Sequence, residues 1–321
     1  FLTAGLAMIV LLAAALFAIP AAGASASAAD TPKVWDGTIA AAFAGGTGTE
    51  SDPYQIADGS QLALLAQDVN SDSASLYKDA YIKLTSDIDL GNTAWTPIGG
   101  ATVSFNGNFD GGGHTVSIAN VSADTLAGLF GSNSGTITKL SVKGTVSGKG
   151  GTGGISGFNS GTISMCMFQG SVQGTAYVGG ITGKNEQYAY VINCFTSAEV
   201  TGEVNVGGIC GYNDVGYVNK CVSVGTVSGT NSDSTGSVCG YSRGSSGNLS
   251  NCIFDNEKSS VVGSNGSESY YASGQTTEWL SGSSLAAGLD YSEWNAGSTS
   301  VTPDGDDSRF GTKTTFYFSL K

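Results

Sequence analysis

The chain has 321 residues, of which 49 are glycine and only 12% are charged, and its formal net charge is −13. This charge excludes a general nucleic-acid-binding role, because a protein that follows a row of phosphates must neutralise them with lysine and arginine. Hydrophobic residues make up 40% of the chain, which is not typical of a disordered segment. The composition therefore predicts a folded, repetitive body.

The chain begins with an apolar run from Phe1 to Pro20, which leads into small residues that offer A-x-A sites between Ala24 and Ala28. This order is typical of a secretory signal peptide. A membrane-spanning helix is the alternative, but the run is short and Pro20 interrupts it. We expect residues 1–29 to be a signal peptide without its first residues, and the mature chain to be secreted or held at the cell surface with no membrane span.

Residues 30–126 are expected to form an N-terminal cap and the first turns of the fold. Ser60 predicts the start of a short helix, since the apolar residues from Leu62 to Val69 follow it with helical spacing. Alternating apolar residues at 82–84 and 88–90 then predict two strands. The helix would cover the open end of a solenoid.

Residues 127–256 contain five copies of a glycine-rich repeat, such as VGGITG at 178–183 and VGGICG at 206–211. Each copy closes on a glycine, at Gly131, Gly157, Gly183, Gly211 and Gly240, and these numbers differ by 26, 26, 28 and 29. A near-constant period of this length is the signature of stacked repeats. We predict an all-β fold, a right-handed parallel β-helix in which like positions stack about 4.8 Å apart, with glycine supplying positive φ at the corners.

Aliphatic residues recur at fixed places in each copy. The first column precedes the closing glycine by two positions: Leu129, Ile155, Ile181, Ile209 and Val238. The second column is Ile137, Ile163, Val191, Val218 and Leu249. Both columns are predicted to face the interior, where like packs on like.

Two further columns are predicted to be structural ladders. Asparagine follows the closing glycine by two positions at Asn133, Asn159, Asn185 and Asn213, and these side chains are expected to hydrogen-bond from turn to turn. Cysteine fills an interior column at Cys166, Cys194, Cys221 and Cys252. We expect buried thiols there, and disulfides or a zinc site are the alternatives. Parallel Cβ vectors disfavour disulfides, and the lack of C-x-x-C pairs disfavours a zinc site.

Residues 257–321 are expected to form an irregular C-terminal cap and tail. The apolar residues that can cover the last turn are Trp279, Leu280, Leu285, Leu289 and Trp294. The acidic stretch at 301–309 predicts a solvated linker rather than a calcium loop.

The five motifs, from AGLFG at 127–131 to GSVCG at 236–240, resemble the GLUG motif of bacterial surface proteins, with Ser237 as a departure in the last copy. The segments KLTSDIDL, WTPIGG and FNGNFDGGGHTV resemble the lead-in of such proteins. The resemblance implies an exported β-helix scaffold that forms part of a longer surface protein. Related repeats also occur upstream of the catalytic domain in some immunoglobulin A-specific metallopeptidases, and the family brings no agreed catalytic residue.

Catalytic residues are not evident in the repeats. Neither Glu199 nor Glu203 has a carboxylate at the matching position of a neighbouring copy, the chain has a single histidine, His114, and H-E-x-x-H is absent. Lyases and hydrolases on this fold need carboxylates, alone or with lysine or arginine, gathered on adjacent turns. We expect no catalytic residue, cofactor or metal, and keep a carbohydrate-active β-helix enzyme as the alternative.

Tyrosines mark the corner of the repeat that accepts insertions. They are Tyr188, Tyr190, Tyr212, Tyr217 and Tyr241. Such rings on a rigid ridge can bind a host or environmental glycan, or a surface protein. The alternative is that the rings stack on one another and bind no ligand. The sequence thus predicts a non-catalytic adhesion or interaction scaffold.

Overall fold

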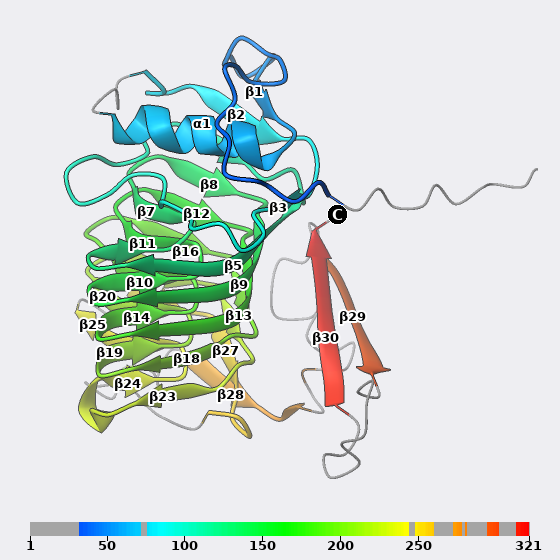
Figure 1. Ribbon diagram of the computed structural model, residues 1–321. Coiled ribbons are helices and arrows are strands. Elements are labelled where there is room, and N and C mark those ends of the chain that lie inside the picture. Colours follow the sequence, from blue (N-terminus) through cyan, green and yellow to red (C-terminus); the bar gives the residue numbers. More distant parts are fainter. Residues whose placement is uncertain are drawn as a thin grey trace, which may run out of the picture. The chain divides into compact units, whose positions relative to one another are not determined.

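The computed structural model describes residues 32–71, 76–243, 248–259, 272–277 and 280, and the backbone of 294–301 and 313–320. The chain folds as a parallel β-solenoid of about seven turns, which confirms the predicted all-β class (Figure 1). Within these residues no helix has both the length and the apolar character needed to cross a membrane. The signal peptide predicted at residues 1–29 lies outside the described part of the chain.

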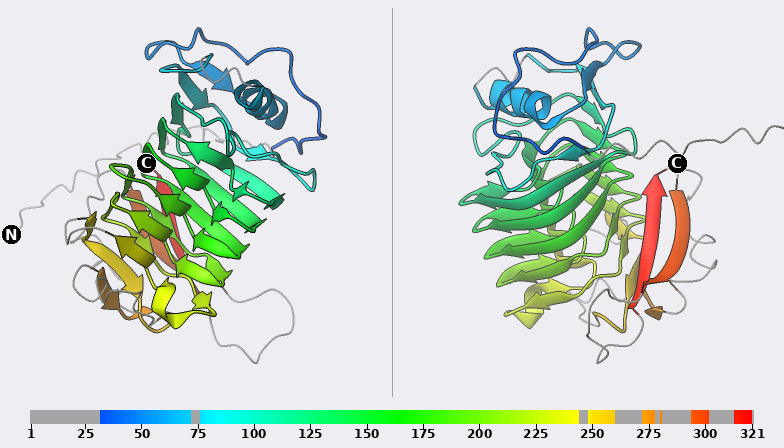
Figure 2. Two further views of the ribbon diagram at one scale, coloured as in Figure 1. Left: turned by 90° about the vertical axis from the view of Figure 1, so that its left-hand side faces the viewer. Right: turned by 45° about the vertical axis from the view of Figure 1, so that its right-hand side comes forward.

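Four parallel sheets run along the stack, and each of the five repeats contributes at least one strand to every sheet (Figures 1 and 2). The eight-stranded sheet contains, in order, β1 (Tyr54–Ile56), β2 (Tyr81–Leu84), β4 (Asn108–Asp110), β8 (Thr136–Thr138), β12 (Thr162–Ser164), β16 (Tyr190–Ile192), β21 (Tyr217–Asn219) and β26 (Leu249–Ser250). The asparagine sheet, so called for its ladder, contains β7 (Phe130–Asn133), β11 (Ser156–Asn159), β15 (Thr182–Asn185), β20 (Cys210–Asp214) and β25 (Cys239–Arg243).

The glycine sheet holds the strands that precede each motif: β6 (Leu126–Ala127), β10 (Gly151–Gly153), β14 (Ala176–Gly179), β19 (Val204–Gly207) and β24 (Thr235–Gly236). The ten-stranded sheet holds β3 (Ile88–Asp89), β5 (Thr115–Ala123), β9 (Ser141–Gly148), β13 (Met167–Gly174), β17 (Phe195–Thr196), β18 (Glu199–Gly202), β22 (Val222–Ser223), β23 (Val227–Gly229), β27 (Cys252–Asp255) and β28 (Ala272–Gln275). A short 3₁₀ helix, η1 (Ser232–Ser234), precedes β24.

The aliphatic columns lie in the core, one turn directly upon the next. Ile163 pairs with Ile137 on one side and with Val191 on the other, and the Ile155 amide donates to the Ile181 carbonyl at 3.0 Å. Every residue of the first two columns is at most 1% exposed. Each turn therefore buries its apolar residues only against its neighbours, as expected of a solenoid.

Helix α1 (Gly59–Asn70) covers the first turns, with its apolar face in the same core cluster. The prediction that Ser60 caps it is wrong, because Asp58 is the N-cap and accepts from the Gln61 amide at 3.0 Å. Ser60 instead donates its hydroxyl to the Asp58 carboxylate. The carboxylate is the stronger acceptor for an unsatisfied first-turn amide.

The glycines of the motif serve close packing rather than positive φ. None of the five closing glycines has positive φ. A Cβ atom at Gly183 would lie 2.4 Å from both the Thr152 nitrogen and the Tyr177 oxygen, so the asparagine sheet packs backbone to backbone against the glycine sheet. The left-handed corner is formed by ordinary side chains, with φ of 51–53° at Lys139, Met165, Asn193, Lys220 and Asn251.

The C-terminal region is described in part. Strand β28 pairs with β27 and so extends the ten-stranded sheet, and Leu280 is buried. Strands β29 (Trp294–Val301) and β30 (Lys313–Leu320) form an antiparallel pair. Several residues expected in the cap lie outside the described part of the chain: Trp279, Leu285, Leu289, the side chain of Trp294 and the acidic stretch after Val301.

Candidate functional site

A row of aromatic side chains runs along the outer face of the asparagine sheet. Strand register places Phe158, Lys184, Tyr212 and Tyr241 at one position of successive turns. The residue that follows each of them, Asn or Ser, belongs to the buried ladder, so alternation along the strand turns this column outward. We call these four residues, together with Tyr177, the aromatic row.

The rings of the aromatic row are in contact with one another. Tyr212 and Tyr241 stack at 5.4 Å between centroids with planes 21° apart, and Tyr177 lies 5.5 Å from Tyr212 and 6.4 Å from Phe158. The Lys184 ammonium fills the gap, 5.6 Å from the Phe158 ring centroid and 6.0 Å from that of Tyr212. This is cation–π geometry, so the row is continuous over four turns.

Tyr177 reaches the row from the glycine sheet through an unusual backbone conformation. Its φ is 51°, a region that bulky residues seldom adopt. The position stacked on it is Asn205, with φ of 54°, and asparagine tolerates this conformation better. A tyrosine held there at an energetic cost is consistent with a functional placement of its ring.

A network of charges fixes the cationic part of the row. The Lys184 ammonium lies 3.1 Å from a Glu186 carboxylate oxygen and 3.5 Å from one of Asp214, which also pairs with Arg243 at 2.5 Å. Partial burial lowers the pKa of Lys184, but the two carboxylates outweigh burial and leave that pKa above its ordinary value. Lys184 is therefore charged at neutral pH. The two carboxylates of the network balance its charge and that of Arg243.

A hollow of about 420 Å³ opens at one end of the row. Phe158, Tyr177 and Leu126 line it, and an exposed ion pair of 2.7 Å between Lys149 and Asp124 stands at its rim. Apolar rings beside a few polar groups are what ligand pockets commonly offer. The arrangement can accept a flat, partly apolar face such as that of a sugar ring.

The five predicted tyrosines divide between two sheets. Tyr212 and Tyr241 belong to the aromatic row, whereas Tyr190 and Tyr217 stack at 4.9 Å and 11° on the eight-stranded sheet. Tyr188, in the corner before β16, is 66% exposed. The sequence analysis did not predict Phe158, Tyr177 and Lys184 as site residues. A signal was present for Phe158 and Lys184, because each directly precedes the ladder asparagine of its copy, as Tyr212 does.

The asparagine column forms a buried amide ladder. Each amide nitrogen donates to the side-chain oxygen of the next turn: Asn133 to Asn159 at 2.8 Å, Asn159 to Asn185 at 2.8 Å, Asn185 to Asn213 at 2.9 Å, and Asn213 to Ser242 at 3.1 Å. All four asparagines are fully buried. The ladder holds the edge of the asparagine sheet in register directly beneath the aromatic row.

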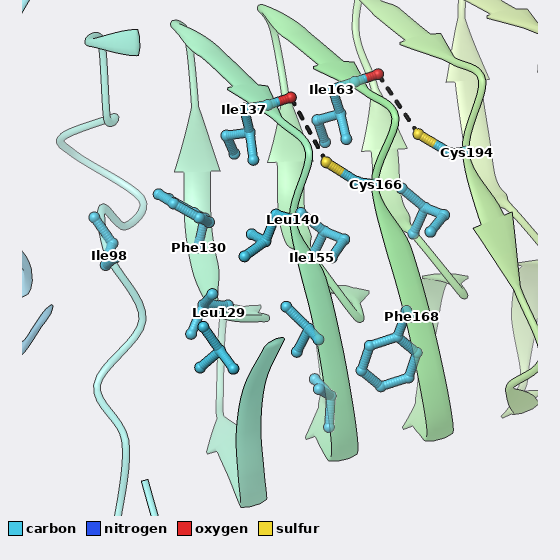
Figure 3. Packing of buried hydrophobic residues seen from close by; sticks show 14 of the residues in the cluster. Ile98, Leu129, Phe130, Ile137, Leu140, Ile155, Ile163, Cys166, Phe168 and Cys194 are labelled. Atoms are coloured by element: carbon cyan, nitrogen blue, oxygen red, sulfur yellow. Dashed lines mark hydrogen bonds between the residues drawn. The ribbon is translucent and has the colours of Figure 1, made fainter. Parts of the chain in front are cut away.

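The cysteine column forms a second ladder in the core, and all six cysteines of the chain are buried thiols. The Cys166 thiol donates to the Ser164 and Ile137 carbonyls at 3.3 and 3.7 Å, and Cys194, Cys221 and Cys252 repeat this pattern. Figure 3 shows the bonds from Cys166 to Ile137 and from Cys194 to Ile163. Burial raises the pKa of the Cys166 and Cys221 thiols. These thiols are consequently poor nucleophiles.

A second group of charged side chains lies in the first turns of the solenoid. Glu199 pairs with Ser171, as the sequence predicted. Outside the repeats, however, Lys83 and Asp110 lie at matching positions of β2 and β4, with 4.0 Å between their charged atoms. They line a groove of about 590 Å³ that also includes Glu50 and Lys139. Alignment of the repeats could not reveal this set, because Glu50, Lys83 and Asp110 precede the first copy.

The remaining polar residues offer little for a metal. His114 lies 3.2 Å from an Asp87 oxygen, and its backbone neighbour Thr115 donates to the same oxygen. Within the described residues no group of three or more His, Cys, Asp or Glu side chains could hold a metal ion.

Comparison with known proteins gives one structural relative to report. No family model and no curated protein matches the chain. A crystal structure from Bacteroides ovatus, described as that of a putative immunoglobulin A1 protease, is 27% identical and covers 66% of this chain and 67% of its own, with a TM-score of 0.54. The chain is thus similar in fold and, at low identity, in sequence to that protein.

Proposed function

We propose that the protein is a non-catalytic binding module of the bacterial cell surface, and that the aromatic row is its ligand face. The observation that carries this proposal is the row itself, with four rings and a lysine in contact along the solenoid beside a hollow of about 420 Å³. Tyrosine and tryptophan dominate binding hot spots because they combine a large apolar area with a polar tip. The charge network leaves no unbalanced charge in the row, which favours a ligand bound by stacking.

Secretion and the GLUG assignment belong to the same proposal. They are supported by the apolar N-terminal run and by the motifs, whose fourth residue is Ser, Thr or Cys in four of the five copies for a structural reason. The side chains of Ser156, Thr182 and Cys239 each donate to the carbonyl two residues further on. These bonds lie within strands of the asparagine sheet, and a rigid stack of such strands can present a ligand face away from a cell.

Binding without turnover is the expected result of the test. The full chain would be applied to an array of immobilised glycans and to human immunoglobulin A1, the latter because of the name of the Bacteroides ovatus relative. We expect the chain to be retained on a glycan or on the glycoprotein. The amount retained should fall at least tenfold in a Tyr177→Ala/Tyr212→Ala variant. Leu76→Ala, which also removes an exposed apolar side chain (60% exposed) but lies outside the aromatic row, is the control and should bind as the unmodified chain does.

The carbohydrate-active enzyme is the second candidate, because Lys83 and Asp110 bring a base and an acid together on adjacent turns. It predicts new reducing ends or unsaturated uronates after incubation of the chain with polysaccharides. Such products, or fragments of immunoglobulin A1, would contradict a purely binding role. Retention that does not depend on Tyr177 and Tyr212 would instead contradict the aromatic row as the ligand face.

A further inference from the structure

The outer face of the eight-stranded sheet carries a second surface, separate from the aromatic row. The inward residues of β2, β4 and β8 are Ile82, Phe109 and Ile137, all fully buried. Alternation therefore turns their neighbours outward. The outward pairs, one per strand, are Tyr81 and Lys83, Asn108 and Asp110, and Thr136 and Thr138.

These outward pairs form the floor of the groove of about 590 Å³. The loop residues Glu50, Ser51 and Pro53 stand on one side, and Lys139 and Met165 also line the groove. The Lys83 and Asp110 side chains are 47% and 39% exposed, so both are held at the surface yet open to solvent. The outward side chains of the floor are therefore polar or charged, and apolar surface lies between them.

The polar floor continues past the groove along the stack. Thr162 and Ser164 of β12 occupy the same two positions, and the Ser164 hydroxyl donates to the Thr138 hydroxyl at 3.1 Å. The next two turns place Tyr190 and Tyr217 in the first of these positions, where their rings stack. An aromatic ring thus stands at each end of the floor, with Tyr81 at one end and the Tyr190–Tyr217 stack at the other.

The chemistry of the floor suits a chain of hydroxyl groups. A hydroxyl both donates and accepts hydrogen bonds, and the groove supplies acceptors in Asp110 and Glu50 and donors in Lys83 and Lys139, with the Asn108 amide able to do both. Two lysines balance two carboxylates, so the groove favours no net charge on its ligand. Because the chain carries −13 overall, a polyanion would be repelled on approach.

We infer that this groove is a binding site for a neutral, linear oligosaccharide that lies along the stack from Tyr81 towards the Tyr190–Tyr217 rings. Strands about 4.8 Å apart repeat the same pair of outward positions, which gives a polymer of repeating hydroxyls a matching series of contacts. The terminal rings provide flat faces on which a sugar ring can stack. The site does not depend on the aromatic row.

Calorimetric titration of the full chain with neutral hexasaccharides tests the inference. The probes are cellohexaose, xylohexaose, mannohexaose, maltohexaose, laminarihexaose and chitohexaose, with hexagalacturonate as the charged comparison. We expect at least one neutral hexasaccharide to bind, and to bind at least tenfold more tightly than hexagalacturonate. Thr138→Trp would fill the middle of the floor and should weaken this binding at least tenfold while thermal unfolding stays unchanged.

Two further variants separate this site from the aromatic row. Asp110→Asn keeps the shape of the floor but removes an acceptor and should weaken binding, whereas Tyr212→Ala should leave hexasaccharide binding unchanged. Binding by none of the neutral probes overturns the inference, as does binding that survives Thr138→Trp. If binding is lost only with Tyr212→Ala, the groove inference fails while the proposed function of the aromatic row stands.

Discussion

At the scale of single residues, the asparagine ladder is an interaction that one substitution should break. Asn185 sits in the middle, accepts from Asn159 and donates to Asn213 and to the Ala189 carbonyl. Asn185→Ala would leave buried polar groups on both neighbours without this partner and should lower the free energy of unfolding by about 3 kcal/mol. Urea unfolding measures the change.

The control for Asn185 is the same substitution at an exposed asparagine. Asn256→Ala removes a solvent-exposed side chain and should change the free energy of unfolding by less than about 0.5 kcal/mol. Equal effects of the two substitutions would show that the ladder adds no more than any surface amide.

The thiol ladder predicts that stability falls at alkaline pH. Burial raises the pKa of Cys166 and Cys221 well above the ordinary value of 9.0, so the folded state retains protons that the unfolded chain loses. The contribution of these two thiols is complete below the ordinary thiol pKa and is lost as the pH rises above it. Unfolding in urea at pH 7, 9 and 10, under reducing conditions, measures this slope.

A double variant isolates the thiols from other alkaline effects. Cys166→Ala/Cys221→Ala should unfold with a shallower pH dependence between pH 9 and 10. Leu140 occupies the same column in the first copy, so the column accepts other apolar side chains. An unchanged slope in the variant would assign the alkaline loss to other groups, such as Tyr77, whose pKa is raised by burial and by its bond to Asp68.

At the scale of the strands, the contact between the asparagine sheet and the glycine sheet depends on the closing glycines. A Cβ at Gly183 would lie 2.4 Å from backbone atoms of Thr152 and Tyr177, and these cannot rotate away. Gly183→Ala should therefore cost about 3 kcal/mol of unfolding free energy. Gly100→Ala, where a Cβ meets nothing within 4 Å, should be neutral or stabilise by about 0.5 kcal/mol.

The two glycine variants would be compared by thermal unfolding. A lower melting temperature for Gly183→Ala alone is the expected result. If both variants melt with the unmodified protein, the two sheets can separate enough to admit a methyl group, and the motif glycines would need another explanation.

The elements also show what the sequence could and could not predict. The stacking of Ile155 on Ile181 was predictable, because a constant period leaves one way to bury every copy. The role of Gly183 was not, since a sequence pattern does not distinguish a glycine that turns the chain from one that lets two backbones touch. Tyr177 was missed because only the structure shows that a left-handed backbone turns its ring towards Tyr212.

For the molecule as a whole, each turn contacts only its neighbours, so stability should be close to additive over turns. Deleting residues 157–182 removes one complete turn and joins Ser156 to Gly183, which restores the pairing of equivalent positions, including Asn133 with Asn185. This variant should fold and unfold cooperatively, with a denaturant m-value lower by roughly one seventh. Deleting only residues 170–182 joins Gln169 to Gly183 and places Asn185 opposite Val146, so that unlike columns stack, and that variant should fail to give a cooperative transition. Far-UV circular dichroism and urea unfolding distinguish the two variants, and a half-turn deletion as stable as the full-turn deletion would refute the argument that register from turn to turn holds this solenoid together.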